Sequence, residues 1–195
     1  MPRHSLVVRL THWINAIASF ALIVSGAAIL LAHPRLYWGE TGAVGAPSLI
    51  DLPIPFIFGH SGWGRYLHFL AAWVGAITGV VYVSAGIVTR RFSHAHASFQ
   101  SYNTLQRLTY VTVIFVLGPL IVMSGLAFSP MLASAAPWLV GVFGGQQAAR
   151  TIHFFAAAAI VAFLIVHVAM VAATGFTARM RSMIVGDPGS VAERL

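Results

Sequence analysis

Hydrophobic residues form four long stretches in this chain, separated by shorter segments that contain proline, glycine and charged residues. The stretches extend approximately over residues 11–32, 66–88, 108–128 and 151–176. Each is long enough to cross about 30 Å of hydrocarbon as a helix. The pattern predicts an all-α membrane protein built as a bundle of four transmembrane helices.

Arginine flanks these stretches unevenly, which predicts their orientation. Eight arginines adjoin the two chain ends and the connection between the second and third stretches: Arg3, Arg9, Arg90, Arg91, Arg107, Arg179, Arg181 and Arg194. Three lie on the opposite side: Arg35, Arg65 and Arg150. By the positive-inside rule, both termini are cytoplasmic in a bacterial inner membrane. The net charge of +7 is then a topology signal and indicates no nucleic-acid partner.

The connections between the stretches are too short to form a soluble domain. The longest, Pro34–Gly64, is predicted to be a long first periplasmic loop and cannot bury a core of its own. We therefore expect residues 1–195 to form a single transmembrane domain. Prolines interrupt the apolar segment Leu49–Phe58, so it either lies on the membrane surface or receives a partner protein. The second outer loop, Ser129–Ala149, is similar, and the two loops are either caps over the bundle or a docking surface.

Composition limits the chemistry. The chain is 58% hydrophobic, 8% charged and free of cysteine. Absence of cysteine excludes disulfides, thiolate-bound metals, iron–sulfur clusters and covalently attached haem. Any haem must therefore be bound non-covalently, through histidine or methionine.

Two histidines lie inside the fourth apolar stretch. His153 and His167 are 14 residues apart, so on a helix they lie about 21 Å apart along the axis and within about 40° of one face. A histidine in a membrane segment is costly and indicates a functional site. Two such histidines at two depths require two partners, and two haems account for both.

Depth assigns a second histidine to each level. With the predicted orientation, His12 lies at the cytoplasmic level of His167, and His68 lies at the outer level of His153. Each pair comes from two helices, as bis-imidazole ligation of a haem in a helical bundle requires. The alternative for these four histidines is an intramembrane polar network or a proton path.

Small residues near these levels give room for a flat macrocycle. Gly26 and Ser124-Gly125 lie at the outer level, and Gly75, Gly79 and Gly86 thin the second helix. Close helix packing is an equally good interpretation of these glycines. The other histidines are expected to be solvated, with His60 the most credible rival to His68; they are His4, His33, His60, His94 and His96.

Several of these motifs resemble a known family. Arg9-Leu-Thr-His-Trp13 with Asn15, the pair Ser25-Gly26, and His153 with His167 are similar to the four-helix di-haem b-type cytochromes. These include b561-like proteins and the membrane subunits of formate dehydrogenase, nickel–iron hydrogenase and thiosulfate reductase. The runs His33–Glu40 and Gly144–Arg150 resemble most the thiosulfate-reductase branch, whose members often serve periplasmic molybdopterin oxidoreductases.

The resemblance implies a quinone site on the cytoplasmic side. The run Tyr102–Arg107 is similar to a stretch in which an asparagine helps to bind quinone beside the inner haem, which would place Asn103 near His167. Gln106 and Arg107 are then supporting candidates, and Arg107 or Arg9 could pair with a haem propionate. The alternative for Asn103 is a cap on the third helix.

Together these features predict a respiratory electron carrier with two non-covalent haem b groups. Electrons pass between the membrane quinone pool and a periplasmic oxidoreductase subunit, expected to be a molybdopterin enzyme docked on the outer loops; the direction is open. A first alternative is a stand-alone b561-type superoxide:quinone oxidoreductase, which would not need the long first loop. A second is a haem-free transporter, which predicts internal repeats and carboxylates in the spans. The four acidic residues all lie outside the spans.

Overall fold

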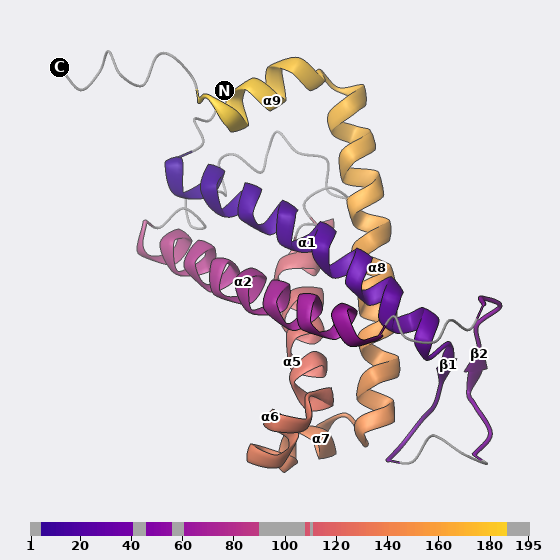
Figure 1. Cartoon of the computed structure of the whole chain (residues 1–195). Coiled ribbons are helices and arrows are strands. Elements are labelled where there is room, and N and C mark those ends of the chain that lie inside the picture. Colours follow the sequence, from indigo (N-terminus) through magenta and orange to yellow (C-terminus); the bar gives the residue numbers. More distant parts are fainter. Residues whose placement is uncertain (1–4, 41–45, 56–60, 90–107, 110, 187–195) are drawn as a thin grey trace.

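The computed structural model describes residues 5–40, 46–55, 61–89, 108–109 and 111–186. This part of the chain is mostly helical (Figure 1). The three longest helices are α1 (Leu6–Ala32), α2 (Ser61–Val88) and α8 (Gln146–Ala173). All three are long and apolar enough to cross a membrane. At about 1.5 Å per residue each measures roughly 40 Å.

The third predicted span is described only in part. A π-helical turn, η2 (Val113–Leu117), continues into α5 (Gly118–Phe128), and this apolar segment is shorter than the other three. The amide of Gly118 bonds to the carbonyl of Val113, five residues back. Pro119 has no amide hydrogen for the regular ladder, which explains why the helix changes its winding here.

The long helices pack as two pairs. α1 lies against α2, and α5 lies against α8, whereas contact between the two pairs is sparse (Figure 1). Small side chains allow α1 and α2 to approach closely: Ala18, Ala28 and Ala71 are buried. A Cβ on Gly64 would lie 3.2 Å from the Cβ of Ala28. Gly75 likewise faces Ala18, so at this position the packing interpretation of the glycine holds.

Polar contacts within the bundle are few and specific. The hydroxyl of Thr78 on α2 donates to Oδ1 of Asn15 on α1 at 2.7 Å. Large apolar side chains point away from the packed interfaces, as Ile17 and Phe20 show with 71% of their surface exposed. Because apolar side chains face lipid in a membrane protein, this exposure agrees with a transmembrane bundle.

One end of the bundle, called the outer end after the predicted orientation, carries the loops and short helices. These elements are α6 (Pro130–Ala135), α7 (Pro137–Val142), and strands β1 (Arg35–Leu36) and β2 (Ile50–Asp51). The strands pair antiparallel, with Arg35 opposite Asp51. This small sheet departs from the predicted all-α fold, and it ties part of the segment Leu49–Phe58 to the chain that leaves α1.

The chain after α1 also closes the start of α8. The carbonyl of Gly39 accepts the amides of Gln147 and Ala148, and the carbonyl of Tyr37 accepts the hydroxyl of Thr151 at 2.6 Å. Leu36 is completely buried beneath this segment. Backbone amides at a helix start have no partner within the helix, so the loop carbonyl satisfies them. The described part of the first outer loop is therefore a structured cap.

The opposite, inner end carries α9 (Phe176–Ile184), which follows a turn at Gly175 with φ 106°. Two α1 side chains hold the far end of α9. The indole nitrogen of Trp13 donates to the carbonyl of Met183 at 3.1 Å, and the Arg9 guanidinium donates to the carbonyl of Ile184. These carbonyls lack partners within α9, and Arg9 also places a positive charge at the negative end of the helix dipole.

The observed helix ends correct the predicted spans. α1 begins at Leu6 and α2 at Ser61, five residues before the predicted starts, and α8 begins at Gln146 and ends at Ala173 instead of covering 151–176. Hydropathy marks only the part of a helix that suits hydrocarbon, whereas the helices continue through polar residues such as Arg9 into the interface. The predicted end of the fourth span is wrong because Gly175 turns the chain into α9.

Candidate functional site

The outer histidines come from facing helices and lie together. His68 is in the third turn of α2, and His153 is in the third turn of α8. Their ring centres are 6.2 Å apart. The predicted juxtaposition of these two residues is therefore confirmed, and their role as ligands stays a prediction.

The inner histidines form a second pair of the same kind. His12 lies near the start of α1 and His167 near the end of α8, with ring centres 6.5 Å apart. Each pair thus takes one histidine from the α1–α2 pair and one from α8. The depth argument placed all four residues correctly relative to one another.

These separations suit a metal held between two imidazoles. Two metal–nitrogen bonds of about 2 Å in line, together with the half-widths of the two rings, place ring centres roughly 6 Å apart. Within the described ranges, no group of three or more metal-ligating side chains is found. Two ligands are too few for a bare ion, but they suffice for a haem, whose macrocycle supplies the other four. The residues present therefore fit haem better than a free metal ion.

A serine from the neighbouring helix bonds to each outer histidine. Ser25 Oγ lies 3.0 Å from Nδ1 of His68, and Ser124 Oγ lies 3.1 Å from Nδ1 of His153. Both serines are completely buried. The sequence analysis noted these positions for their small size and missed the hydrogen bonds. The available signal was a serine before glycine at the depth of each outer histidine.

Glycine follows each serine and faces the same ring. A Cβ on Gly26 would lie 3.5 Å from Cε1 of His68, and a Cβ on Gly125 would lie 3.1 Å from Cε1 of His153. These two glycines therefore leave space for the imidazoles. Among the other candidates, Gly75 packs against α1 and Gly79 has open space around it.

The inner pair has an aromatic environment instead. The ring of Phe163 lies 5.7 Å from that of His167 at an interplanar angle of 28°, and Trp13 lies edge-on to His12 at 5.5 Å. Phe163 precedes His167 by one helical turn, so the stacking follows from helix geometry. The inner imidazoles are oriented in part by packing.

Arg9 lies three residues before His12 on α1. Its guanidinium reaches the end of α9, while its Nε atom is buried and has no hydrogen-bond partner among the residues that the structure describes. A buried charged donor without a partner is costly. Arg9 is therefore suited to an additional acceptor, as the predicted pairing with a haem propionate would provide.

The outer pair has the same arrangement on two helices. Arg65 lies three residues before His68, and Arg150 lies three residues before His153. Residues three apart share a helix face. Arg150 donates to the backbone carbonyl of His33, and no ion pair joins either arginine to a described carboxylate.

Two of these cations also influence His33. Partial burial lowers the pKa of the His33 imidazole below its usual value, and the nearby Arg150 and Arg65 guanidinium groups lower it further. All three groups therefore gather at the outer end of the bundle. The two guanidinium charges favour an anion there, while the lowered pKa leaves His33 uncharged at neutral pH.

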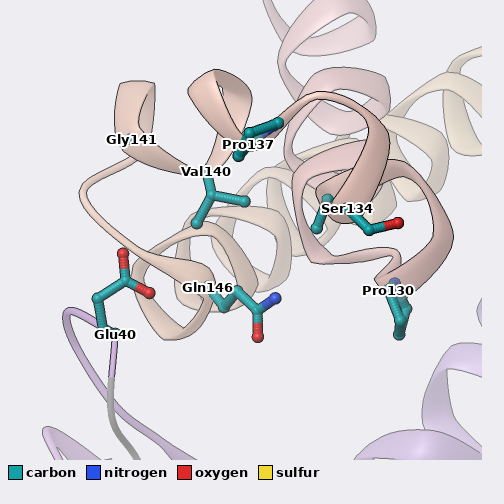
Figure 2. Close-up of a pocket in the computed structure, with 8 residues that line it drawn as sticks. Glu40, Pro130, Ser134, Pro137, Val140, Gly141 and Gln146 are labelled. Carbon is teal, nitrogen blue, oxygen red and sulfur yellow. The ribbon is translucent and has the colours of Figure 1, made fainter.

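An open hollow lies beside this region at the outer end. It has a volume of about 520 Å³ and is lined by Glu40, Pro130, Ala133, Ser134, Pro137, Val140, Gly141 and Gln146. Figure 2 shows the side chains of Val140 and Gln146 between Glu40 on one side and Ser134 and Pro130 on the other. Trp138 and Met131, which follow the lining residues Pro137 and Pro130 in the sequence, expose 65% and 71% of their surface. The lining of the hollow itself contains one carboxylate, that of Glu40.

Several predicted residues lie outside the part of the chain that the structure describes. They include the quinone candidates Asn103, Gln106 and Arg107. The remaining histidines in this group are His4, His60, His94 and His96. Their predicted roles stay predictions.

Known proteins match nearly the whole chain. A family model described as "Prokaryotic cytochrome b561" matches residues 3–186. The curated protein "Putative protein-methionine-sulfoxide reductase subunit YedZ1" of Azospira oryzae is 32% identical over 191 aligned residues, covering 87% of this chain and 89% of that protein. No solved structure matches the chain. The family match includes both histidine pairs and all the helices described above.

Proposed function

This chain belongs to the prokaryotic cytochrome b561 family of haem b electron-transfer proteins, and we propose that it carries electrons between membrane quinol and a periplasmic oxidoreductase. One observation carries the proposal. Two pairs of histidines lie at opposite ends of one bundle, and their ring separations, 6.2 Å and 6.5 Å, are nearly equal. Each bound haem b supplies reversible one-electron chemistry of its iron.

The chain's own residues would bind and orient the two haems. His68 and His153 would hold the outer haem, and His12 and His167 the inner one. At the outer site, Arg65 and Arg150 lie one turn nearer the surface than the histidines and offer two positive charges for two propionates. Arg9 is placed equivalently beside His12, with a buried Nε that finds no acceptor within the described ranges.

Quinone is proposed to bind on the cytoplasmic side near the inner haem. Support comes from the similarity of the run Tyr102–Arg107 to known quinone-binding stretches, in which the Asn103 amide would donate to a quinone carbonyl. Gln106 and Arg107 would support this contact. Protons released by quinol oxidation would leave to the cytoplasm.

The partner is proposed to dock at the outer end. The relative's printed name describes a reductase subunit, which favours electron flow from quinol to a reductase partner. The hollow beside α6 and α7, with Glu40 in its lining and the exposed Met131 and Trp138 on the same two helices, offers a place for an apolar and basic segment of that partner. A molybdopterin enzyme is the partner that the resemblance to the thiosulfate-reductase branch favours.

Reconstituted vesicles would test this function. The purified chain is placed in liposomes loaded with quinol, and a membrane-impermeant oxidant such as ferricyanide is added outside. We expect chain-dependent quinol oxidation that falls at least tenfold in His153→Ala and in His12→Ala, because either change breaks the route across the bilayer.

A matched control is His33→Gln, which alters a histidine outside both pairs and should keep the wild-type rate. Equal rates in empty and chain-containing vesicles would contradict the proposal. Reduction of the chain by externally generated superoxide, with no partner present, would instead favour a stand-alone superoxide:quinone oxidoreductase.

A further inference from the structure

We propose that Ser25 and Ser124 are positioning residues that hold His68 and His153 in the tautomer able to bind the iron of the outer haem. The inference rests on the proposed function, since it concerns the outer haem assigned there. It adds a matched pair of residues that act through the histidines and only at the outer site.

The contacts are short and come from the neighbouring helix. Ser25 on α1 reaches His68 on α2 at 3.0 Å, and Ser124 on α5 reaches His153 on α8 at 3.1 Å. Neither serine exposes any surface. Each bond therefore joins the two helices of one packed pair exactly where the histidine must be oriented.

The position of the hydroxyl proton decides which group is the donor in each serine–histidine hydrogen bond. Ser25 Oγ lies 2.6 Å from the carbonyl of Ala21, and Ser124 Oγ lies 2.6 Å from the carbonyl of Leu120. A serine hydroxyl has one proton, and in both cases the carbonyl one turn back takes it. The serine oxygen can then only accept a hydrogen bond from the histidine.

The histidine tautomer follows from this accounting. Nδ1 must carry the proton that the serine accepts, so in the neutral imidazole Nε2 keeps its lone pair. Nε2 is then the nitrogen available to a metal. A partner that holds the other ring nitrogen fixes both the tautomer and the ring orientation of a metal-binding histidine.

The two sides of the outer site repeat the same construction. In each, the glycine after the serine faces Cε1 of the same ring, at Cβ distances of 3.5 Å for Gly26 and 3.1 Å for Gly125. The serine thus holds the ring while the glycine leaves room for it. The two sides share the bonded histidine atom, the carbonyl partner of the serine and the glycine that follows it. A chance contact would not repeat all three features on two different helix pairs.

The inner site differs at His167, whose ring stacks on that of Phe163. Loss of the serines should therefore change the outer haem and leave the inner haem as an internal reference. This asymmetry separates a positioning role from a general role in packing.

The test is haem content and redox potential in Ser25→Ala, Ser124→Ala and the double variant. Alanine keeps the helix and removes the serine oxygen from each ring, while the backbone carbonyls of Leu22 and Ile121 stay as further acceptors for His68 and His153. Loss of such a supporting contact typically lowers metal affinity about 10- to 100-fold. We expect the double variant to retain one haem, the inner one, and each single variant to show a raised outer potential because a weaker imidazole donor stabilises ferric iron less.

Four further variants make the result specific. His167→Ala removes the inner haem and so assigns the outer signal. Thr174→Ala removes a hydroxyl with the same bond to a carbonyl one turn back, far from any histidine pair, and should change nothing. Ser25→Thr and Ser124→Thr each keep a hydroxyl and should restore the wild-type potential of the outer haem.

The outcomes separate this inference from the proposed function. Wild-type chain with no haem would overturn both. Two haems in the wild type, with outer content and potential unchanged in the alanine variants, would overturn only the role of the serines. If the double variant does not fold, the single variants still decide, because each keeps one serine–histidine bond and the inner haem reports on the fold.

Discussion

Gly26 and Gly125 differ in how closely they approach their histidines. A Cβ at Gly125 would lie 3.1 Å from Cε1 of His153, which forces the ring to move, whereas the 3.5 Å at Gly26 is ordinary van der Waals contact. Gly125→Ala should therefore remove more of the outer haem than Gly26→Ala. The measurement is the haem-to-protein ratio of each purified variant.

Gly79→Ala is the control for this comparison, because in the described part of the chain nothing beyond its own chain neighbours and helix backbone lies within 4 Å of the new Cβ. Replacing a helical glycine by alanine otherwise stabilises a helix by about 0.5–1 kcal/mol. The control should thus keep full haem content. Equal losses at Gly26 and Gly125 would show that the closer contact is not what limits the site.

For single residues, the sequence predicts the depth along a helix but not the direction in which the side chain points around the helix axis. The levels of the four histidines follow from chain position and span direction alone. The bond from Ser25 to His68 depends on how α1 and α2 are turned about their axes, and apolar residues surround these helices too evenly to reveal that. From the sequence, Ser25 and Ser124 are therefore interpreted only as small residues, although the hydroxyl group is the part of each that contacts a histidine.

Among the elements, the α1–α2 pair contains one polar link that can be measured in isolation. Thr78 donates to Asn15 at 2.7 Å, at a position on the α1–α2 interface separate from the bond between Ser25 and His68. Hydrogen bonds between transmembrane helices contribute about 0.6 kcal/mol on average. A double-mutant cycle with Asn15→Ala and Thr78→Val, read by unfolding in detergent, should give a coupling free energy of about that size.

The cycle isolates the link because each single variant also changes local packing. A coupling free energy near zero would mean that the two residues act independently and that this hydrogen bond does not help to join α1 to α2. Haem content should stay at the wild-type level in both single variants, since the bond between Asn15 and Thr78 involves no histidine.

Helix existence was predictable and helix ends were not. Long apolar runs identify the membrane-crossing part of α1, α2 and α8. The ends depend on local features that hydropathy ignores: α8 starts where the Gly39 carbonyl caps it, and it stops at Gly175. The short sheet of β1 and β2 likewise depends on a long-range pairing, and strands of two residues are too short to give a recognisable sequence pattern.

For the whole molecule, two helix pairs with sparse contact between them are joined by two histidine pairs at opposite ends. The arrangement would place the haems between the pairs, where they would complete the bundle. The apolar runs predicted the long helices, whereas their grouping into two pairs depends on packing that hydropathy does not show. The identity of a partner protein depends on surfaces that meet only in a complex, so the sequence of this chain does not predict it.

The most direct measurement of the central claim is the number of haem b groups bound by the purified chain. Reduced-minus-oxidised spectra with pyridine haemochrome quantification should give two per chain, falling to one in His68→Ala or His153→Ala and, independently, in His12→Ala or His167→Ala. A colourless protein, or one whose haem content is unchanged by these substitutions, would contradict the account.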